Sequence, residues 1–366
     1  MTKRVAVIGA GVVGLAAAWA LERRGITCLV FEQGAPGGAQ SGGESRIFRH
    51  AHNDPRQFEL AVRSRQGWRD WEAEFGLDLI SSDGSMVIGE AAVARLGKYD
   101  GEPGVRIREL GPAQLREVLP ILAPYDGPAL IDDAAGAIHT RLTIASLITS
   151  VGLNLVPERI ESVRPRPEGG VEVVSTFGDR VFDSVVVAAG AGTADLAATA
   201  GLKVPSQPQA HMRLTLPLAG GVKAPRLACI QDSSGFFGEA AAYGSPVQGN
   251  REYAVGLALS TPVDLDADAD PLSGLADRTA DYVAEAMPGL DRGGAVSFQR
   301  WVTELPWAAD GLAIWQRGEA FFIAGHNLFK LAPALGSALA DCVENGEVGR
   351  NFRPEDKLGE AVLEAR

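Results

Sequence analysis

Cysteine is scarce in this 366-residue chain, which contains only Cys28, Cys229 and Cys342, and no two of them form a Cys-x-x-Cys pair. That usage excludes a disulfide scaffold and a cysteine-based zinc site, and it suits a reducing compartment. Long apolar runs are also missing, because the longest, near residues 12–21, is short and interrupted by glycine. No signal-peptide pattern precedes the first strand-like segment. We therefore expect a cytoplasmic protein without a membrane partner.

Basic residues are too few for a nucleic-acid binder. Lysine and arginine number 34 against 46 aspartate and glutamate, a formal net charge of −12, whereas phosphate contacts need clustered basic side chains. Apolar residues make up 46% of the chain and charged residues 22%, as in an ordinary globular protein, and the length favours two domains. Glycine is the exception: the chain has 44 glycines, and their clusters mark the candidate sites.

The first glycine cluster follows an apolar, β-branched run at residues 5–8, which predicts a strand buried on both faces of a parallel sheet. The next residues read Gly-x-Gly-x-x-Gly, and a helix-like and a second strand-like segment follow. Gly9 allows the tight turn, Gly11 lets the backbone approach a pyrophosphate, and Gly14 lets the helix pack closely on the strand. The N-terminus of the predicted helix then offers N–H groups to the phosphates.

Glu32 ends the second predicted strand, 21 residues after Gly11, where an acid accepts hydrogen bonds from the ribose hydroxyls. An acid at this position repels a 2′-phosphate, which disfavours NADP. Strand, glycines, helix, second strand and acid occur in register, and together they predict dinucleotide binding. The alternative is a glycine-rich turn that binds nothing.

The segment after Glu32 distinguishes FAD from NAD. Residues 33–46 form a long Gly/Ser-rich loop, which resembles the segment against the pyrophosphate and isoalloxazine in glutathione-reductase-type flavoproteins. The stretch Ser-Arg-Ile-Phe-Arg-His-Ala at 45–51 is similar to the amine-oxidising family of monomeric sarcosine oxidase and N-methyltryptophan oxidase. That family is a branch of the D-amino-acid-oxidase superfamily, in which glycine oxidase is a more distant relative. Residues 183–192, 309–312 and 321–330 resemble its central strand and C-terminal signature.

This resemblance implies an α/β fold with an α+β second domain. A Rossmann-like FAD-binding domain of the glutathione-reductase type would be joined to a substrate domain built on a mixed sheet. The chain order assigns the discontinuous FAD-binding domain to residues 1–80, 140–200 and 300–366. It assigns the substrate domain to residues 81–139 and 201–299.

The resemblance also assigns the cofactor site. FAD is expected to be non-covalent, because residues 299–306 lack the cysteine that tethers the flavin in sarcosine-oxidase relatives. The residues expected to bind it lie in the glycine turn, the Gly/Ser loop, two strand ends and the C-terminal signature. They are Gly9, Gly11, Val13, Gly14, Glu32, Gln33, Ser41, Arg46, Ile160, Ala189, Gly190, Gly325, His326, Asn327, Leu328, Phe329 and Lys330.

The predicted catalytic residues are cations. The resemblance places Arg49 on the substrate carboxylate, which its fork-shaped guanidinium matches, with Lys330 as a second cation and Arg46 nearer the flavin edge. A surface ion pair or a contact to FAD phosphate is the alternative for Arg49 and Arg46. The family's oxygen-activating lysine has no counterpart, since no lysine occurs between Lys223 and Lys330. Either Arg300 assists O2, or electrons pass to another acceptor.

No metal site is expected from the spacing of the histidines. His50, His52 and His326 have no second group at metal-ligand spacing. We expect a structural role for the first two and a flavin contact for His326. The acidic run at 264–270 lacks the glycine and terminal glutamate of a calcium loop, and we interpret it as a solvated turn.

Together these features predict oxidation of the C–N bond of an N-substituted (secondary) amino acid such as an N-alkyl glycine. Hydride transfer to flavin would be followed by hydrolysis of the imine. Leu257, Ala258 and Val302, in place of the family's aromatic and histidine substrate contacts, favour a bulky apolar substituent. The alternatives are a primary glycine or D-amino-acid deaminating oxidase, a non-oxidase amine dehydrogenase, and a flavoprotein whose FAD is structural or sensory. The expected partners are an amino-acid-like small molecule and O2 or another electron acceptor, in a monomer or small homo-oligomer.

Overall fold

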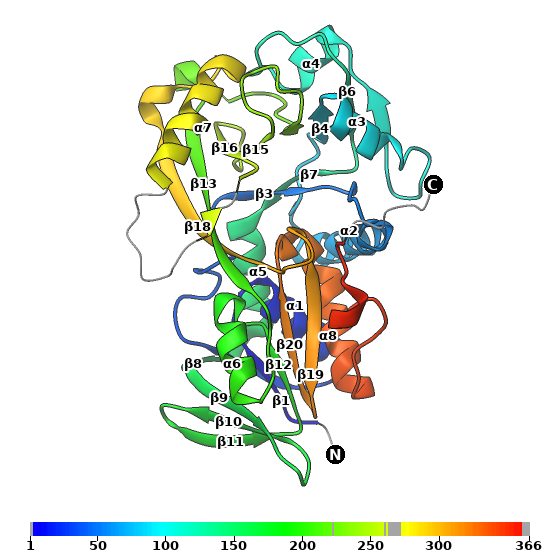
Figure 1. The fold of residues 1–366 in the computed structure, drawn as a ribbon, viewed down its shortest axis with the longest axis vertical. Helices are drawn as coiled ribbons and strands as arrows, with labels where there is room; N and C mark the ends of the chain where they lie inside the picture. The colour runs from blue at the N-terminus through cyan, green and yellow to red at the C-terminus, as the bar shows by residue number, and fades with distance from the viewer. Residues whose placement is uncertain (1–2, 222, 260, 263–271, 361–366) are drawn as a thin grey trace.

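The computed structural model describes residues 3–221, 223–259, 261–262 and 272–360. In this part of the chain the two largest sheets have six and nine strands, and Figure 1 shows them in opposite halves of the molecule along its longest axis. The expected α/β fold with a mixed second sheet is confirmed. None of the described helices has the length and apolar character needed to cross a membrane.

The six-stranded sheet contains the first predicted strand at its centre. Strand β1 runs parallel to β2 on one side and to β12 on the other, and all four of its residues are buried. The strand order is β19 (Leu312–Arg317), β20 (Ala320–Gly325), β12 (Ser184–Val187), β1 (Val5–Ile8), β2 (Cys28–Glu32) and β8 (Leu155–Pro157).

Helices and a small sheet cover the two faces of this sheet. Side chains alternate along β1, so that Val5 and Val7 join one apolar cluster while Ala6 and Ile8 join another. The first cluster packs under α1 (Val12–Arg23), α5 (Thr140–Val151) and α8 (Ala332–Asn345). The second lies under α6 (Thr193–Thr199) and a sheet of β9 (Ile160–Pro165), β10 (Val171–Ser175) and β11 (Gly178–Phe182).

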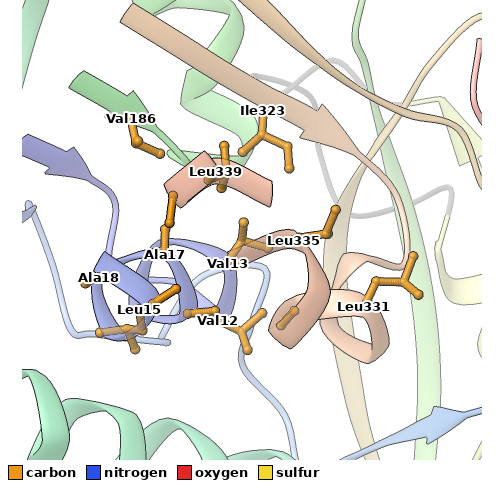
Figure 2. Packing of buried hydrophobic residues seen from close by; sticks show 14 of the residues in the cluster. Val12, Val13, Leu15, Ala17, Ala18, Val186, Ile323, Leu331, Leu335 and Leu339 are labelled. Atoms are coloured by element: carbon orange, nitrogen blue, oxygen red, sulfur yellow. The ribbon is translucent and has the colours of Figure 1, made fainter. Parts of the chain in front are cut away.

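Helices α1 and α8 pack closely. Figure 2 shows Val13 and Ala17 of α1 facing Leu335 and Leu339 of α8. The approach needs a glycine, because a Cβ on Gly336 would lie 2.5 Å from the backbone oxygen of Ala16.

The nine-stranded sheet is largely antiparallel and has a core of its own. Strand β13 pairs with β18 over nine residue positions, and the single parallel pair described joins β14 to β4. Helices α4 (Pro112–Val118) and α7 (Ser273–Ala286) contribute to the core. The strands are β4 (Ser85–Ile88), β5 (Ile107–Glu109), β6 (Ala129–Asp132), β13 (Gln207–Pro217), β14 (Cys229–Asp232), β15 (Ala242–Pro246), β16 (Glu252–Leu257), β17 (Thr261–Pro262) and β18 (Val296–Glu304).

Three elements occupy the middle of the molecule. The ribbon of β3 (Ser45–Phe48) and β7 (Gly136–His139) lies between the two large sheets, and α2 (Pro55–Phe75) runs below it in Figure 1. Ser45 and Ser245 share a hydrogen bond of 2.8 Å, which fastens the ribbon to the nine-stranded sheet. Helix α3 (Glu90–Gly97) follows β4.

Candidate functional site

The glycine turn after β1 has no room for side chains. Gly9 has a φ of +101°, and a Cβ there would lie 2.5 Å from the backbone oxygen of Ala188. A Cβ on Gly14 would lie 1.9 Å from the oxygen of Gly9. Gly11 is the N-cap of α1 and makes no side-chain capping bond. No side chain of the turn itself covers this helix N-terminus, which suits the close approach of a pyrophosphate.

Glu32 organises this turn. Its carboxylate accepts hydrogen bonds from the backbone N–H groups of Ala10 and Gly34, each at 2.8 Å. Ser41 in the Gly/Ser loop accepts a hydrogen bond of 3.0 Å from the N–H of Val12, in the first turn of α1. The acid and the loop are thus held beside the helix N-terminus, where FAD would bind.

The parallel strands bring the other predicted FAD residues to the same edge. Strands β20, β12, β1 and β2 are consecutive neighbours and mutually parallel, so their carboxyl ends meet at one edge. Gly190, just after β12, has a φ of +57°, and a Cβ there would lie 2.6 Å from Oε1 of Gln40. This arrangement suits FAD, whose phosphates the turn at α1 would hold while the residues after β12 and β20 would lie toward its flavin.

The structure places the remaining predicted FAD residues as follows. Gln33 is exposed, and Ile160 is the first residue of β9, buried in the apolar cluster that contains Phe31. Arg46 is buried, and it donates hydrogen bonds to the backbone oxygens of Ser45, at 2.8 Å, and of Gly42. Val13 is buried on α1, Ala189 precedes Gly190, and Gly325, His326, Asn327, Leu328, Phe329 and Lys330 continue from the end of β20 into α8.

Lys330 is a buried cation. The residue is 5% exposed. Its backbone oxygen accepts hydrogen bonds from Ser64 and Trp68 of α2, at 2.8 and 2.9 Å. Burial and then the charge of Arg49 lower the pKa of Lys330 from 10.5 to about 7, while Asp310 acts in the opposite direction. Lys330 can therefore take up or release a proton near neutral pH.

Arg49 is held in place by a carboxylate that sequence analysis treated only as part of the C-terminal signature. Its Nη2 lies 2.6 Å from Oδ2 of Asp310, and its Nη1 donates to the backbone oxygen of Ala51 at 2.6 Å. Asn327 donates to the other oxygen of Asp310. The side chains of Arg49 and Asp310 are 18% and 27% exposed, so this ion pair is partly buried.

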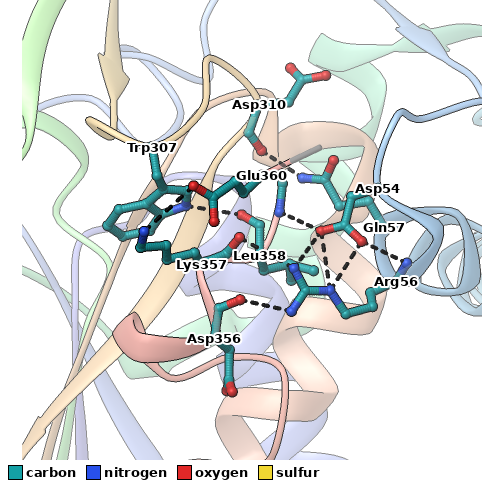
Figure 3. Close-up of polar contacts among 10 residues, drawn as sticks. Asp54, Arg56, Gln57, Trp307, Asp310, Asp356, Lys357, Leu358 and Glu360 are labelled. Carbon is teal, nitrogen blue, oxygen red and sulfur yellow. Dashed lines mark hydrogen bonds and ion pairs between the residues drawn. The ribbon is translucent and has the colours of Figure 1, made fainter. Parts of the chain in front are cut away.

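Asp310 is itself anchored through its backbone. Its carbonyl oxygen accepts a hydrogen bond of 2.6 Å from Gln57 of α2 (Figure 3). Figure 3 also shows Asp54, which accepts from Arg56 and from the N–H of Gly359. Although burial opposes it, the charges of Lys330 and Arg49 hold the pKa of Asp310 well below its usual value. Asp310 is therefore a fixed anion among the predicted substrate cations.

Two further residues that sequence analysis missed approach this group from α3 and the turn after it. Tyr99 donates from its hydroxyl to the backbone oxygen of His52 at 2.7 Å. Arg95, four residues earlier, is half-buried, and burial, followed by the charge of Arg49, lowers its pKa. Burial, with Lys330 and Arg49, also lowers the pKa of His52 well below its usual value, so this ring is neutral.

His50 lies apart from these cations. Its Nδ1 is 2.6 Å from Oδ2 of Asp132, and both side chains are buried. Arg300 belongs to β18, where it is the partner of His211, but its side chain and the acidic run at 264–270 lie outside the residues whose side chains are described.

One cluster in the described residues has the composition of a metal site. Ligand atoms of His211, Glu304 and His326 all lie within 4.8 Å of one another, and Nδ1 of His326 is 2.9 Å from the backbone oxygen of Ala309. The expectation of no metal site rested on spacing along the sequence, which does not report on groups brought together by the fold. The cluster escaped sequence analysis because its members come from β13, β18 and the segment after β20, and so have no local spacing.

The chain is similar to known proteins over most of its length. The family model described as FAD dependent oxidoreductase (DAO) matches residues 4–342. Monomeric sarcosine oxidase from Bacillus sp. (strain B-0618) is 26% identical over 216 residues, which are 56% of this chain and 55% of that protein. The chain is also 28% identical to 4-methylaminobutanoate oxidase (formaldehyde-forming) from Paenarthrobacter nicotinovorans over 228 residues, 58% of this chain and 27% of that one. The match thus spans about half the length of the first relative and less of the second.

Solved structures share the fold over nearly the whole chain. The open form of NikD, described as an unusual amino acid oxidase essential for nikkomycin biosynthesis, superposes with a TM-score of 0.81 at 20% identity and covers 100% of both chains. Glycine oxidase from Geobacillus kaustophilus gives a TM-score of 0.77 at 22% identity, covering 96% of this chain and 98% of that one. The resemblance expected from the sequence is confirmed, and the chain belongs to the DAO family of FAD-dependent oxidoreductases.

Proposed function

We propose that this protein is an FAD-dependent oxidase of an N-substituted amino acid, such as an N-alkyl glycine. The observation that carries the proposal is the grouping of two cationic side chains, the partly buried Arg49 and the buried Lys330, around Asp310 beside the segment that follows β20. Buried cations of this kind suit a substrate carboxylate. The names of two relatives, sarcosine oxidase and 4-methylaminobutanoate oxidase, point to N-methylated amino acids.

The chain's own residues would bind and orient the substrate. Asp310 and the oxygen of Ala51 fix the guanidinium of Arg49, which has five N–H donors and keeps some available for a carboxylate. Lys330, with its pKa near 7, would gain its proton as the carboxylate arrives. FAD, when bound, would accept the hydride from the carbon next to the amine nitrogen, and water would then hydrolyse the resulting imine.

The proposal also assigns a separate domain to each of the two large sheets. Residues 1–80, 140–200 and 300–366 would form the FAD-binding domain, which also carries Arg49 and Lys330, and residues 81–139 and 201–299 would form the substrate domain. The second candidate function is a primary glycine or D-amino-acid deaminating oxidase, favoured by the structural similarity to glycine oxidase. Release of ammonia in place of an alkylamine or aldehyde from a substrate panel would identify it. Turnover with a dye but not with O2 would identify an amine dehydrogenase.

The test removes the proposed clamp. In an Arg49→Met variant we expect FAD to remain bound while kcat/KM for N-alkyl glycines falls by roughly a hundredfold or more, because truncating one partner of a buried charge pair costs about 3–5 kcal/mol. Amines without a carboxylate should be affected little. Arg63→Met, an exposed position on α2, is the matched control. Loss of flavin from Arg49→Met would assign the residue to the cofactor site, and unchanged turnover of amino acids would refute the carboxylate clamp.

A further inference from the structure

The group of charges around Asp310 has more cations than anions. Arg49, Lys330 and Arg95 all act electrostatically on one another, and Asp310 is the carboxylate that acts on each of them. Among the described residues, Arg49 is the arginine that forms an ion pair with the carboxylate of Asp310. The other oxygen of that carboxylate accepts a hydrogen bond from Asn327. Neither Arg95 nor Lys330 forms an ion pair with any described residue. Arg95 is therefore left to be balanced, and so is Lys330 whenever it is protonated.

Arg95 lies one helical turn after Ala92 on α3, so it is on the side of the helix that packs against the chain near Arg49. Ala92, Leu96 and Tyr99 of this segment join one buried cluster with Ala51 and Phe58. The ring of Tyr99 stacks on Phe58 at 3.9 Å between centroids.

The hydroxyl of Tyr99 also bonds the backbone of His52. These contacts fix α3 against the chain that carries Arg49. Arg95 lies between Ala92 and Leu96 in sequence and is half-buried.

The charge balance at this site depends on the charged groups of the bound substrate. A substrate α-carboxylate held by Arg49 and Lys330 neutralises one positive charge, and the amine must be uncharged to lose a hydride. Arg95 then remains a partly buried guanidinium without a partner, and burying an unpaired charge is costly. A second acidic group on the substrate would remove that cost.

Resting on the proposed function, we infer that the substrate is an N-substituted amino acid with two acidic groups, and that Arg95 is the residue that binds the second one. The α-carboxylate occupies Arg49 and Lys330, and the second carboxylate, on the N-substituent or the side chain, lies against Arg95. This differs from the bulky apolar substituent suggested by Leu257, Ala258 and Val302. Sequence alone offered no reason to place Arg95 near the site, because it lies in the segment assigned to the other domain.

The experiment compares two substrates of similar size on the FAD-bound enzyme. N-propylglycine has one carboxylate, and N-(2-carboxyethyl)glycine carries a second at the end of its substituent. We expect the wild type to prefer the diacid, with a KM about 10- to 100-fold lower. In Arg95→Met that preference should vanish through a rise in the KM of the diacid, with kcat little changed and the KM of the monoacid unchanged.

Arg95→Lys should restore part of the preference, because lysine keeps the charge but not the fork. Lys98→Met, at an exposed position one residue beyond α3, is the matched control and should behave as the wild type. If Arg95→Met weakens both substrates equally, Arg95 binds the α-carboxylate and the inference is wrong. An equal preference for the two substrates in the wild type also overturns it.

A second readout does not depend on turnover. Glutarate carries two carboxylates and no amine, and butyrate carries one. We expect glutarate to raise the melting temperature of the wild type more than butyrate does, and this difference to disappear in Arg95→Met. If no amino acid is oxidised but the glutarate difference is present, the proposed function fails while the anion site at Arg95 stands. If amino acids are oxidised but glutarate and butyrate act alike, the dianion inference fails alone.

Discussion

Replacing Lys330 by methionine should stabilise the protein, although it removes a residue of the proposed site. Lys330 is only 5% exposed, and the pKa of its ammonium group falls from 10.5 to about 7. A difference of one pKa unit between the folded and unfolded states corresponds to about 1.36 kcal/mol, so the buried charge costs on the order of 5 kcal/mol. Methionine keeps the length and apolar stem of the side chain and removes that cost.

The pH dependence of this stability gain shows whether the charge of Lys330 is its cause. Below pH 7 Lys330 is charged in both states, and the folded state carries the full cost. Between pH 7 and 10.5 the folded protein has lost the proton that the unfolded chain still binds, so the wild type becomes more stable as the pH rises. The gain from Lys330→Met should therefore be greatest at pH 6, fall to about 2 kcal/mol near pH 9 and vanish near pH 10.5.

Urea unfolding of the FAD-saturated, substrate-free protein, followed by far-UV circular dichroism at pH 6 and pH 9, measures this gain. Lys98→Met, on an exposed lysine, should change the free energy of unfolding little at either pH. A gain of equal size at both pH values would show that methionine acts through apolar packing alone. A loss of stability at pH 6 would refute the reasoning, because it would mean that the charged ammonium is well paired in the folded protein.

Three other predictions concern the cofactor site. Gly14→Ala should prevent FAD retention and lower the melting temperature, because its Cβ would lie 1.9 Å from the Gly9 oxygen. Gly274→Ala is the control, because nothing lies within 4 Å of a Cβ at that position. A Gly14→Ala protein with full FAD occupancy would contradict the close approach. Glu32→Ala should weaken FAD binding by roughly 10- to 100-fold, at about 1.5–3 kcal/mol for hydrogen bonds to a charged group, as measured by fluorescence titration of the apoprotein; an unchanged affinity would exclude the carboxylate as the ribose ligand. Acid precipitation should release the flavin into the supernatant, because all three cysteines are buried and burial raises the pKa of each thiol; a yellow protein pellet would demonstrate a covalent link.

Local sequence was sufficient to predict the strand–turn–helix unit that is proposed to bind FAD. The strand, the three glycines, the helix and Glu32 lie within 28 consecutive residues, and the constraints on them are short-range: a positive φ at Gly9 and a close approach at Gly14. Such constraints act between near neighbours in the chain, so residue identity alone reveals them. The start of the helix was predicted less well, because the helix was expected to follow Gly14 whereas α1 begins at Val12.

The charge arrangement of the site was decided by the tertiary structure. Arg49 and Asp310 are 261 residues apart in the chain, and Arg95 reaches the same group from a helix that follows a strand of the other sheet. His211, Glu304 and His326 likewise meet only when β13, β18 and the end of β20 are assembled.

The physical reason is the range of the forces. Glycine geometry and helix capping act within a few residues, whereas burial and Coulomb interactions depend on distance in space and on the exclusion of water. Sequence alone therefore predicted the glycine turn and the acid beside it, and only the packing of the two sheets decided how many charges gather around Asp310.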